Sequence, residues 1–514
     1  MSNPINDPLF SLIKSLSKAE KRQFRLQSER QNDALFVQLF HAVDKSKAYN
    51  EATILERISG LKKSQLSNLK AHLYYHLLDT LRTLDRQKDI RIALRDQVDY
   101  AQVLYNKGLY QQSLRMLSKA KLQAAEHQEI ELKMQILEFE KLIEARHITR
   151  SIENRAEQLS SESRLCIQQL TSLSKLSSLA LNLYGMYLKL GHVRNEKEAV
   201  MLKSFFENNL PETNLKNMTF YEKVNLFQAY SWYSYILQDF LMFYRYTQKW
   251  VDLFHEYPLQ KQSDPALYIK ALNNLLNAHF FNMNEEKFSH DLNELESFWR
   301  DNEEHFNENT KTLAFVHTYT AKINKHFLEG TFTKGLKIVP EVMELIKIHQ
   351  LQLDTHRALV FYYKIACLYF GSGDNQNAIE YLNKIINLKV GNLRADIQCF
   401  ARILHLIAHY ELKNYSLMEY LLKSVYHFLS KHRDMSLVME EILKFLRTSN
   451  HLNAREIRTS FRRLKEHLEL IAKNPYERRS FLYLDIISWL ESKISRRPVQ
   501  EVIREKFLKK IPRI

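Results

Sequence analysis

The sequence predicts an all-α protein built from stacked helical hairpins, and three observations support this fold class. The chain has only 9 Gly and 9 Pro in 514 residues, whereas globular proteins average about 7% Gly and 5% Pro, so turns that need either residue are scarce. Apolar side chains recur at spacings of three and four residues, the period of one buried helix face. One helix–turn–helix unit, residues 362–385, also recurs in weaker copies along the chain.

The hairpin at residues 362–385 is the clearest copy. Its two buried faces are predicted to comprise Tyr362, Ile365, Ala366 and Tyr369 in the first helix and Ala378, Leu382 and Ile385 in the second. Gly371 and Gly373 are expected to end the first helix, because glycine readily adopts the left-handed conformation found at helix C-termini. Asp374 or Asn375 is then expected to cap the second helix.

This hairpin resembles the tetratricopeptide repeat. The matching residues are Ala366, Tyr369, Gly373, Ala378 and Leu382, whereas Asn375 and Ile385 depart from the pattern. A second copy turns at Gly108, and weaker copies turn at Gly191, Asp239, near Asn284, at Gly330 and at Lys413–Asn414. The resemblance implies a tetratricopeptide-like α-solenoid of stacked helical hairpins with helical caps at both ends.

The spacing of the copies departs from that family. Turns from residue 191 onward lie roughly 40–48 residues apart, longer than the tetratricopeptide period of about 34, so longer helices or insertions are expected. The resemblance implies that the first helix of each hairpin lines a groove for a partner. On that ground alone, Lys364 and Asn324 are candidate groove residues, although ordinary solvated helix positions would explain them equally well.

The positive charge of the chain lies at its two ends. The formal net charge is +15; residues 1–95 hold 17 Lys and Arg against 10 Asp and Glu, and residues 451–514 hold 16 against 8. The middle is neutral, with 41 against 41. We therefore expect three parts: a basic N-terminal helical domain or cap (1–95), a tetratricopeptide-like repeat region (96–450) and a basic C-terminal helical cap (451–514).

The N-terminal part is predicted to contain short helices, with helices at about 34–43 and 64–84. Ser17 and Glu20 form a capping-box pattern at the start of another helix. Lys18, Arg22 and Arg25 crowd one side of that helix and are candidate anion or nucleic-acid contacts. Either a helix-turn-helix DNA reader or a solenoid cap fits this part. The cap is favoured, because a turn glycine and a clear short recognition helix are missing.

The C-terminal part carries a second basic helix face. Arg455, Arg458, Arg462 and Lys465 recur at spacings of three and four residues, apart from the apolar face of the same helix. A solvated face is the favoured interpretation, and phosphate binding is the alternative. Between these ends, residues 220–257 are unusually aromatic but contain few basic residues, which favours an interlocking core over base stacking.

No catalytic or metal-binding motif is visible. The sequence lacks GxxxxGK[ST], GxGxxG, HExxH and GxSxG patterns, and His405 and His409 have no acidic or thiol residue placed to complete a metal site. Cys166 and Cys367 fall on predicted helices among apolar neighbours, so buried reduced thiols are expected. No enzymatic activity, cofactor or metal is predicted.

The expected location is the cytoplasm. The N-terminus shows no basic-then-apolar signal pattern, and no apolar run approaches the roughly 20 residues of a membrane span. The chain also resembles long helical proteins of unknown function in Bacteroidetes, through the segments LIKSLSKAEKRQF and SFLYLDIISWLESKI and the repeat near Gly108. That resemblance implies a bacterial cytoplasmic protein and supplies no activity.

Two functions follow from these patterns. The favoured one is a non-enzymatic scaffold that binds a protein or peptide partner in a pre-formed superhelical groove. The alternative is a nucleic-acid- or ribosome-associated regulator that uses the basic ends. A sensor of phosphorylated or acidic peptides is a third hypothesis that shares the same basic residues.

Overall fold

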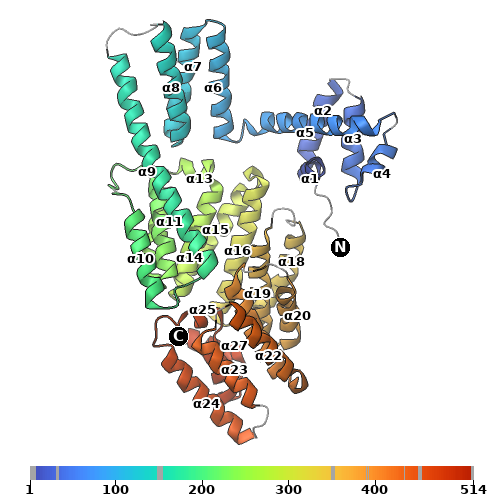
Figure 1. The fold of residues 1–514 in the computed structure, drawn as a ribbon, viewed down its shortest axis with the longest axis vertical. Coiled ribbons are helices and arrows are strands. Elements are labelled where there is room, and N and C mark those ends of the chain that lie inside the picture. The colour runs from blue at the N-terminus through green and yellow to red at the C-terminus, as the bar shows by residue number, and fades with distance from the viewer. Residues whose placement is uncertain are drawn as a thin grey trace. The chain divides into compact units, whose positions relative to one another are not determined.

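A computed structural model describes residues 7–30, 34–58, 60–147, 154–212, 214–348, 353–388, 391, 393–432, 435–449 and 454–510. Every regular element in these ranges is a helix, which confirms the predicted all-α class (Figure 1). The chain divides into two compact units, Met1–Ser163 (unit 1) and Arg164–Ile514 (unit 2). The three-part division expected from charge stays a prediction.

Unit 1 consists of helices joined by short turns. They are α1 (Pro8–Ser15), α2 (Lys18–Arg30), α3 (Ala34–Lys45), α4 (Glu51–Glu56), α5 (Lys63–Asp85), α6 (Ile90–Asn106), α7 (Tyr110–Glu126) and α8 (Ile130–His147). The first five share one core, which includes Phe24, Phe36 and Leu73. Both helices predicted in this region are confirmed as α3 and α5. The predicted capping box at α2 is also present, since Ser17 N donates to Glu20 Oε2 at 2.7 Å and Glu20 N to Ser17 Oγ at 3.3 Å.

Unit 2 is a succession of packed helix pairs. After α9 (Arg155–Leu190), which begins in unit 1, its main helices are α10 (Glu196–Asn209), α11 (Phe220–Ile236), α12 (Phe240–Glu256), α14 (Pro265–Phe281), α15 (Glu285–Asn302), α16 (Glu308–Glu329), α18 (Val339–Ile348), α19 (Thr355–Ser372), α20 (Asn375–Ile386), α21 (Ala395–Glu411), α22 (Tyr415–His432), α23 (Leu437–Ser449) and α24 (Ala454–Ile471). Short helices α13 (Leu259–Ser263) and α17 (Phe332–Gly335) connect some of them. The first helices of successive pairs also contact one another, α14 with α16, α16 with α19, and α19 with α21.

All the turns predicted from the repeat pattern lie between or at the ends of helices. Gly108, Gly191, Gly330 and Gly373 have positive φ angles at helix ends, as does Lys413. Three polar side chains cap the following helices, because Asp239, Asn284 and Asp374 each accept a hydrogen bond from a backbone amide three residues later. These turns are encoded locally, which is why the sequence identifies them.

One glycine in the clearest hairpin has a different role from the one predicted. Gly373 ends α19, with φ of 92° and an αL conformation. Gly371 does not stop the helix; it lies inside α19, where a Cβ would overlap the ring of Phe332. Gly371 therefore provides the space in which α17 packs against α19.

The last helices of the described chain pack against α16 and α19, each the first helix of a hairpin in unit 2. Helices α25 (Arg479–Tyr483), α26 (Ile486–Ser495) and α27 (Val499–Leu508) form what we call the C-terminal segment, and α27 contacts both α16 and α19. Tyr363 donates its hydroxyl to the Tyr483 carbonyl at 2.9 Å, and Arg504 Nη1 donates to the Glu329 carbonyl at 3.0 Å. This segment thus forms part of the inner surface of unit 2.

We predict that Gly371→Ala lowers the free energy of unfolding of unit 2 by about 1–3 kcal/mol, because the added Cβ overpacks a filled site. The matched control is Gly185→Ala in α9, where nothing lies within 4 Å of the added Cβ. That change should raise helix stability by up to about 1 kcal/mol. Urea-unfolding midpoints of the two variants check the pair, and a Gly371→Ala protein as stable as the parent would contradict the packing.

Candidate functional site

The candidate site is a cavity of about 1130 Å³ within unit 2. Its wall is formed by α9, α11, α14, α16, α19 and α21, together with α24 and the C-terminal segment. Ligand pockets in proteins commonly measure about 300–1,000 Å³. The volume therefore fits a small molecule or a short peptide segment.

Three consecutive first helices line the cavity at one common spacing. The lining residues at this spacing, which we call the inner rows, are Lys270, Asn273 and Asn277 of α14, His317, Thr320 and Asn324 of α16, and Arg357, Val360 and Lys364 of α19. Steps of three and four residues place each row on one face of its helix. Because α14 contacts α16 and α16 contacts α19, the rows form one mostly polar surface.

The two groove candidates from the sequence, Lys364 and Asn324, meet in this surface. Lys364 Nζ donates to Asn324 Oδ1 at 2.5 Å, and the ammonium group also lies 5.6 Å from the centre of the Phe327 ring. Asn324 is buried, with 3% of its surface exposed. Burial lowers the pKa of Lys364 from 10.5 to about 8, because the charged form loses hydration; the charge of Arg394 acts in the same direction.

The opposite end of the inner rows carries further cationic groups that the sequence reasoning did not single out. Arg357 pairs with Asp354 at 3.2 Å. Burial lowers the pKa of Lys270, and the charge of Arg357 lowers it further, partly opposed by Asp264. Burial, together with the charges of Arg357 and Lys270, lowers the pKa of His317 to about 3. His317 is therefore neutral at pH 7.

Aromatic side chains form another part of the wall, which we call the aromatic wall: Tyr184, Tyr187, Trp232 and Tyr235. Tyr187 stacks on Trp232 with ring centroids 5.3 Å apart, and Tyr184 lies 4.9 Å from the same indole. The aromatic segment 220–257 thus has two roles. Phe220, Trp250 and Phe254 belong to the core as predicted, whereas Trp232 and Tyr235 face the cavity.

The three cysteines likewise divide between the core and the cavity wall. Cys166 and Cys399 are buried, but Cys367, expected to be a buried thiol, is only partly buried and lines the cavity. Burial raises the pKa of its thiol to about 12, and the nearby charge of Lys364 opposes that rise. Cys367 is therefore a weak nucleophile at neutral pH.

The predicted basic contacts of unit 1 lie on α2. Lys18 and Arg22 are exposed and form no ion pair with any described residue. Arg25 is partly buried; it pairs with Asp44 at 3.5 Å and lies over the Phe40 ring at 5.9 Å. Arg25 thus already has partners within its own unit.

The second basic group lies on α24 in unit 2. Arg455, Arg458 and Arg462 are exposed. Lys465 is partly buried and pairs with Glu469 at 2.8 Å and with Glu491 at 3.4 Å. The solvated basic face predicted for this helix therefore consists mainly of Arg455, Arg458 and Arg462.

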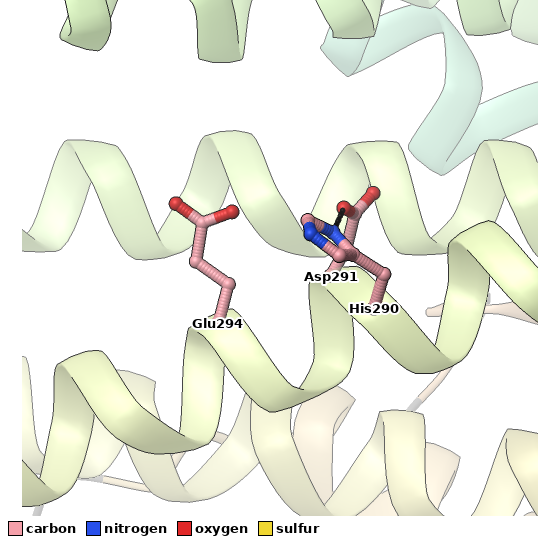
Figure 2. A group of neighbouring side chains, drawn as sticks. All are labelled: His290, Asp291 and Glu294. Atoms are coloured by element: carbon pink, nitrogen blue, oxygen red, sulfur yellow. Dashed lines mark hydrogen bonds and ion pairs between the residues drawn. The ribbon is translucent and has the colours of Figure 1, made fainter.

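Among the described residues, one group has metal-like geometry: His290, Asp291 and Glu294 on α15, with ligand atoms within 4.8 Å of one another (Figure 2). Their carboxylates are already engaged. Asp291 accepts hydrogen bonds from His279 Nε2 and His290 Nδ1, both at 2.9 Å, and Glu294 accepts from the Tyr268 hydroxyl. These bonds indicate a structural network.

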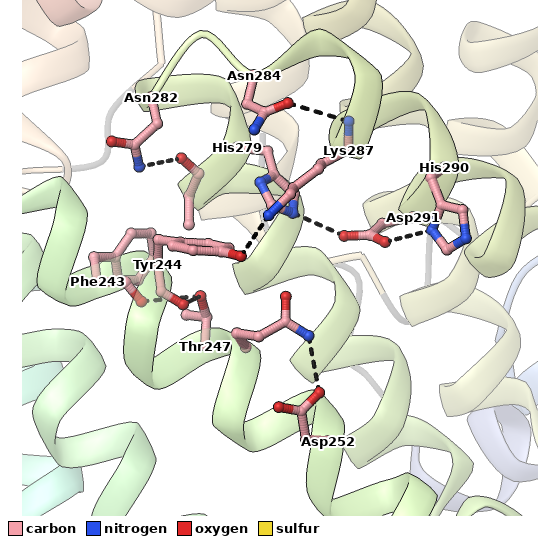
Figure 3. A network of polar contacts seen from close by, with 12 residues as sticks. Phe243, Tyr244, Thr247, Asp252, His279, Asn282, Asn284, Lys287, His290 and Asp291 are labelled. Atoms are coloured by element: carbon pink, nitrogen blue, oxygen red, sulfur yellow. Dashed lines mark hydrogen bonds and ion pairs between the residues drawn. The ribbon is translucent and has the colours of Figure 1, made fainter.

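Figure 3 shows how this network joins three helices. His279 comes from α14, Asp291 and His290 come from α15, and Lys287 of α15 donates to the Tyr244 hydroxyl of α12 at 2.9 Å. Burial alone would raise the pKa of Asp291, but the hydrogen bonds from the two histidines lower it. The hydrogen bond between His290 and Asp291 raises the pKa of His290.

Comparisons with known proteins give no match: no family model fits the chain, and no curated protein or solved structure resembles it significantly. Across the described ranges, none of the helices combines the length and apolarity that crossing a membrane requires.

We predict that the Lys364 ammonium group titrates near pH 8, well below the 10.5 of an ordinary lysine. Reductive ¹³C-methylation of the lysines followed by NMR titration measures this, and Lys364→Arg assigns the signal by removing it. Exposed Lys347 provides the matched reference in the same unit. A Lys364 signal that titrates with the exposed lysines would show that the cavity is as well hydrated as the surface.

We predict that Asp291→Asn destabilises unit 2 by about 1–3 kcal/mol, because it weakens two hydrogen bonds to a buried carboxylate. The pKa of His290 is raised, so its contribution is fully present below pH 6.5 and is lost as pH rises through that raised value. The loss of stability should therefore be larger at pH 6 than at pH 9. Thermal unfolding at both values tests this, with exposed Asp252→Asn as the control; equal losses at both values would exclude the His290 contribution.

Proposed function

We propose that this protein is a non-enzymatic binding scaffold, a tetratricopeptide-like α-solenoid that holds a peptide or a short segment of a protein partner in the cavity of unit 2. The observation that carries the proposal is the alignment of the inner rows. Three consecutive first helices turn polar side chains toward one cavity, the surface that repeat proteins of this kind use for partners.

The chemistry of the inner rows supports binding better than catalysis. Asn273, Asn277 and Asn324 supply amide groups that can both donate and accept hydrogen bonds. Such groups pair readily with the backbone of an extended segment. The thiol of Cys367 is held protonated by its raised pKa, and His317 has no hydrogen-bond partner among the described residues that would orient it as a base.

A pre-formed wall favours binding for an entropic reason. The rows belong to long helices whose opposite faces are packed in the core, as for Phe315 and Ile365 with 0% exposure. Little ordering of the protein is then needed when a ligand enters, so more of the contact free energy appears as affinity.

The alternative proposal is a nucleic-acid- or ribosome-associated regulator. It is supported by Lys18 and Arg22 on α2, which are exposed and form no ion pair with any described residue, and by the exposed arginines Arg458 and Arg462 on α24. Pairs spaced by four residues lie on one face of a helix and could contact neighbouring phosphates. Nuclease sensitivity of the bound partners separates this function from the scaffold.

We predict that Lys364→Glu reduces the capture of specific partners about tenfold or more, because it reverses a charge in the cavity wall. The measurement is affinity purification of the full chain from its native host, with and without nuclease, quantified by mass spectrometry. Lys347→Glu makes the same charge change at an exposed site on α18 and should leave capture unchanged. Lys364→Gln provides a milder second variant if the reversal impairs folding.

Partners that resist nuclease and are lost only from the Lys364 variants support the scaffold. An unchanged partner set in folded Lys364→Glu and Lys364→Gln would show that the partners do not bind in the cavity. Loss of most partners with nuclease, whichever variant is used, would favour the nucleic-acid-associated function, in which the basic faces of α2 and α24 make the contacts.

A further inference from the structure

We propose that the cavity of unit 2 binds a small organic anion, with its acidic group between Lys270 and Arg357 beside His317 and its apolar body against the aromatic wall. This inference goes beyond the proposed function, because it assigns a small-molecule ligand to the cavity in which the scaffold would hold a peptide.

The first observation is the charge balance of the lining. The cationic lining residues are Lys270, Arg357, Lys364, Arg394, Lys473 and Arg478, whereas the acidic ones are Asp354, Glu469 and Asp485. Arg357 and Arg394 are each paired with a carboxylate, of Asp354 and Asp396 respectively. Among the described residues, no carboxylate lies within 4 Å of the ammonium groups of Lys270 and Lys364. The cavity therefore has an excess of positive charge.

The second observation is that these cations are poorly hydrated. A buried charge without a partner raises the free energy of the folded protein. Burial and the charge of Arg357 lower the pKa of Lys270, whose ammonium group lies 6.0 Å from the centre of the Trp250 ring. An anion at this position would compensate the charge of Lys270, with the neutral His317 beside it as a hydrogen-bonding group, and a dry site strengthens each such interaction.

The third observation is that the aromatic wall and Arg357 line the same cavity. Burial raises the pKa of the Tyr184 phenol, and the charge of Arg357 opposes that rise. Tyr184 in turn contacts Trp232, which stacks on Tyr187. A ligand held at Arg357 can therefore place a planar or aliphatic body on these rings.

The size of the cavity favours a small ligand over a long acidic segment. The C-terminal segment contributes Phe481, Val499 and Ile503 to the lining and is bonded to the helices opposite through Tyr483 and Arg504. A long segment would have to displace it. A molecule that fits the existing volume of about 1130 Å³ would not.

The test uses two probes that share one aromatic skeleton. 8-Anilinonaphthalene-1-sulfonate carries an anionic group, and N-phenyl-1-naphthylamine is its neutral counterpart; both report binding by fluorescence. With the full-length protein, we expect one saturable site at which the anionic probe binds about tenfold or more tightly than the neutral one.

Variants locate the site. Lys270→Met and Arg357→Met should each weaken binding of the anionic probe about tenfold while changing the neutral probe less than about twofold. Lys270→Arg keeps the charge and should restore binding. Lys347→Met removes an exposed lysine of the same unit and is the matched control. Circular dichroism melting confirms that each variant is folded.

Displacement distinguishes the ligand sources. Competition by benzoate or phenyl phosphate supports the proposal and separates carboxylate from phosphate ligands. Displacement only by an acidic peptide such as tetraglutamate would overturn the small-anion inference. No saturable binding of the anionic probe, equal affinity for both probes, or an unchanged affinity in folded Lys270→Met would overturn it as well.

The two proposals fail separately. Partner capture from the host is read without any dye and depends on Lys364, whereas the probe measurements depend on Lys270 and Arg357. Charge-selective probe binding without captured partners would support the anion site and contradict the protein scaffold. Nuclease-resistant partners without charge-selective probe binding would support the scaffold and contradict the anion site.

Discussion

In each hairpin of unit 2, the first helix can bury only one face against its own hairpin partner. The C-terminal segment covers part of the other face of α16 and α19. The C-terminal segment approaches the end of α16 closely. Gly330 has φ of 67°, and a Cβ there would lie 2.9 Å from the Cα of Arg504. Two backbones can approach this closely only because the position lacks a side chain. The segment thereby converts an open helix surface into a bounded cavity.

A buried ion pair holds that arrangement. Arg394 and Asp396 pair at 2.7 Å, and the Tyr483 hydroxyl donates to the same carboxylate at 2.6 Å. Burial alone would raise the pKa of Asp396, but Arg394 and the hydrogen bonds lower it to about 2. Removing one partner from such a pair leaves an uncompensated charge and typically costs about 3–5 kcal/mol. Asp396 thus links α21 to the C-terminal segment.

The sequence predicts what is encoded locally and misses what long-range packing decides. Helix periods, the capping box at Ser17 and the turns at Gly373 and Asp374 depend on residues a few positions apart, so they could be identified. Gly371 and Cys367 could not be placed, because their neighbours in space are set by α17 and by the cavity. Lys364 was found only through a family resemblance. Lys270 and Arg357 were missed, because the common surface of the inner rows emerges only once α14, α16 and α19 are placed side by side.

The cavity carries charges that a purely structural interior would not retain. Hydrophobic residues of similar size at Lys270 and Lys364 would avoid the cost of dehydrating two ammonium groups, and replacing buried charges in this way is often neutral or stabilising. In the protein, Lys364 donates to Asn324 and lies 5.6 Å from the Phe327 ring, and Lys270 lies 6.0 Å from the Trp250 ring. Their retention is explained if a bound anion compensates them. Because the Asp396 network opposes displacement of the C-terminal segment, the ligand that best satisfies both conditions is short, acidic and partly aromatic or aliphatic.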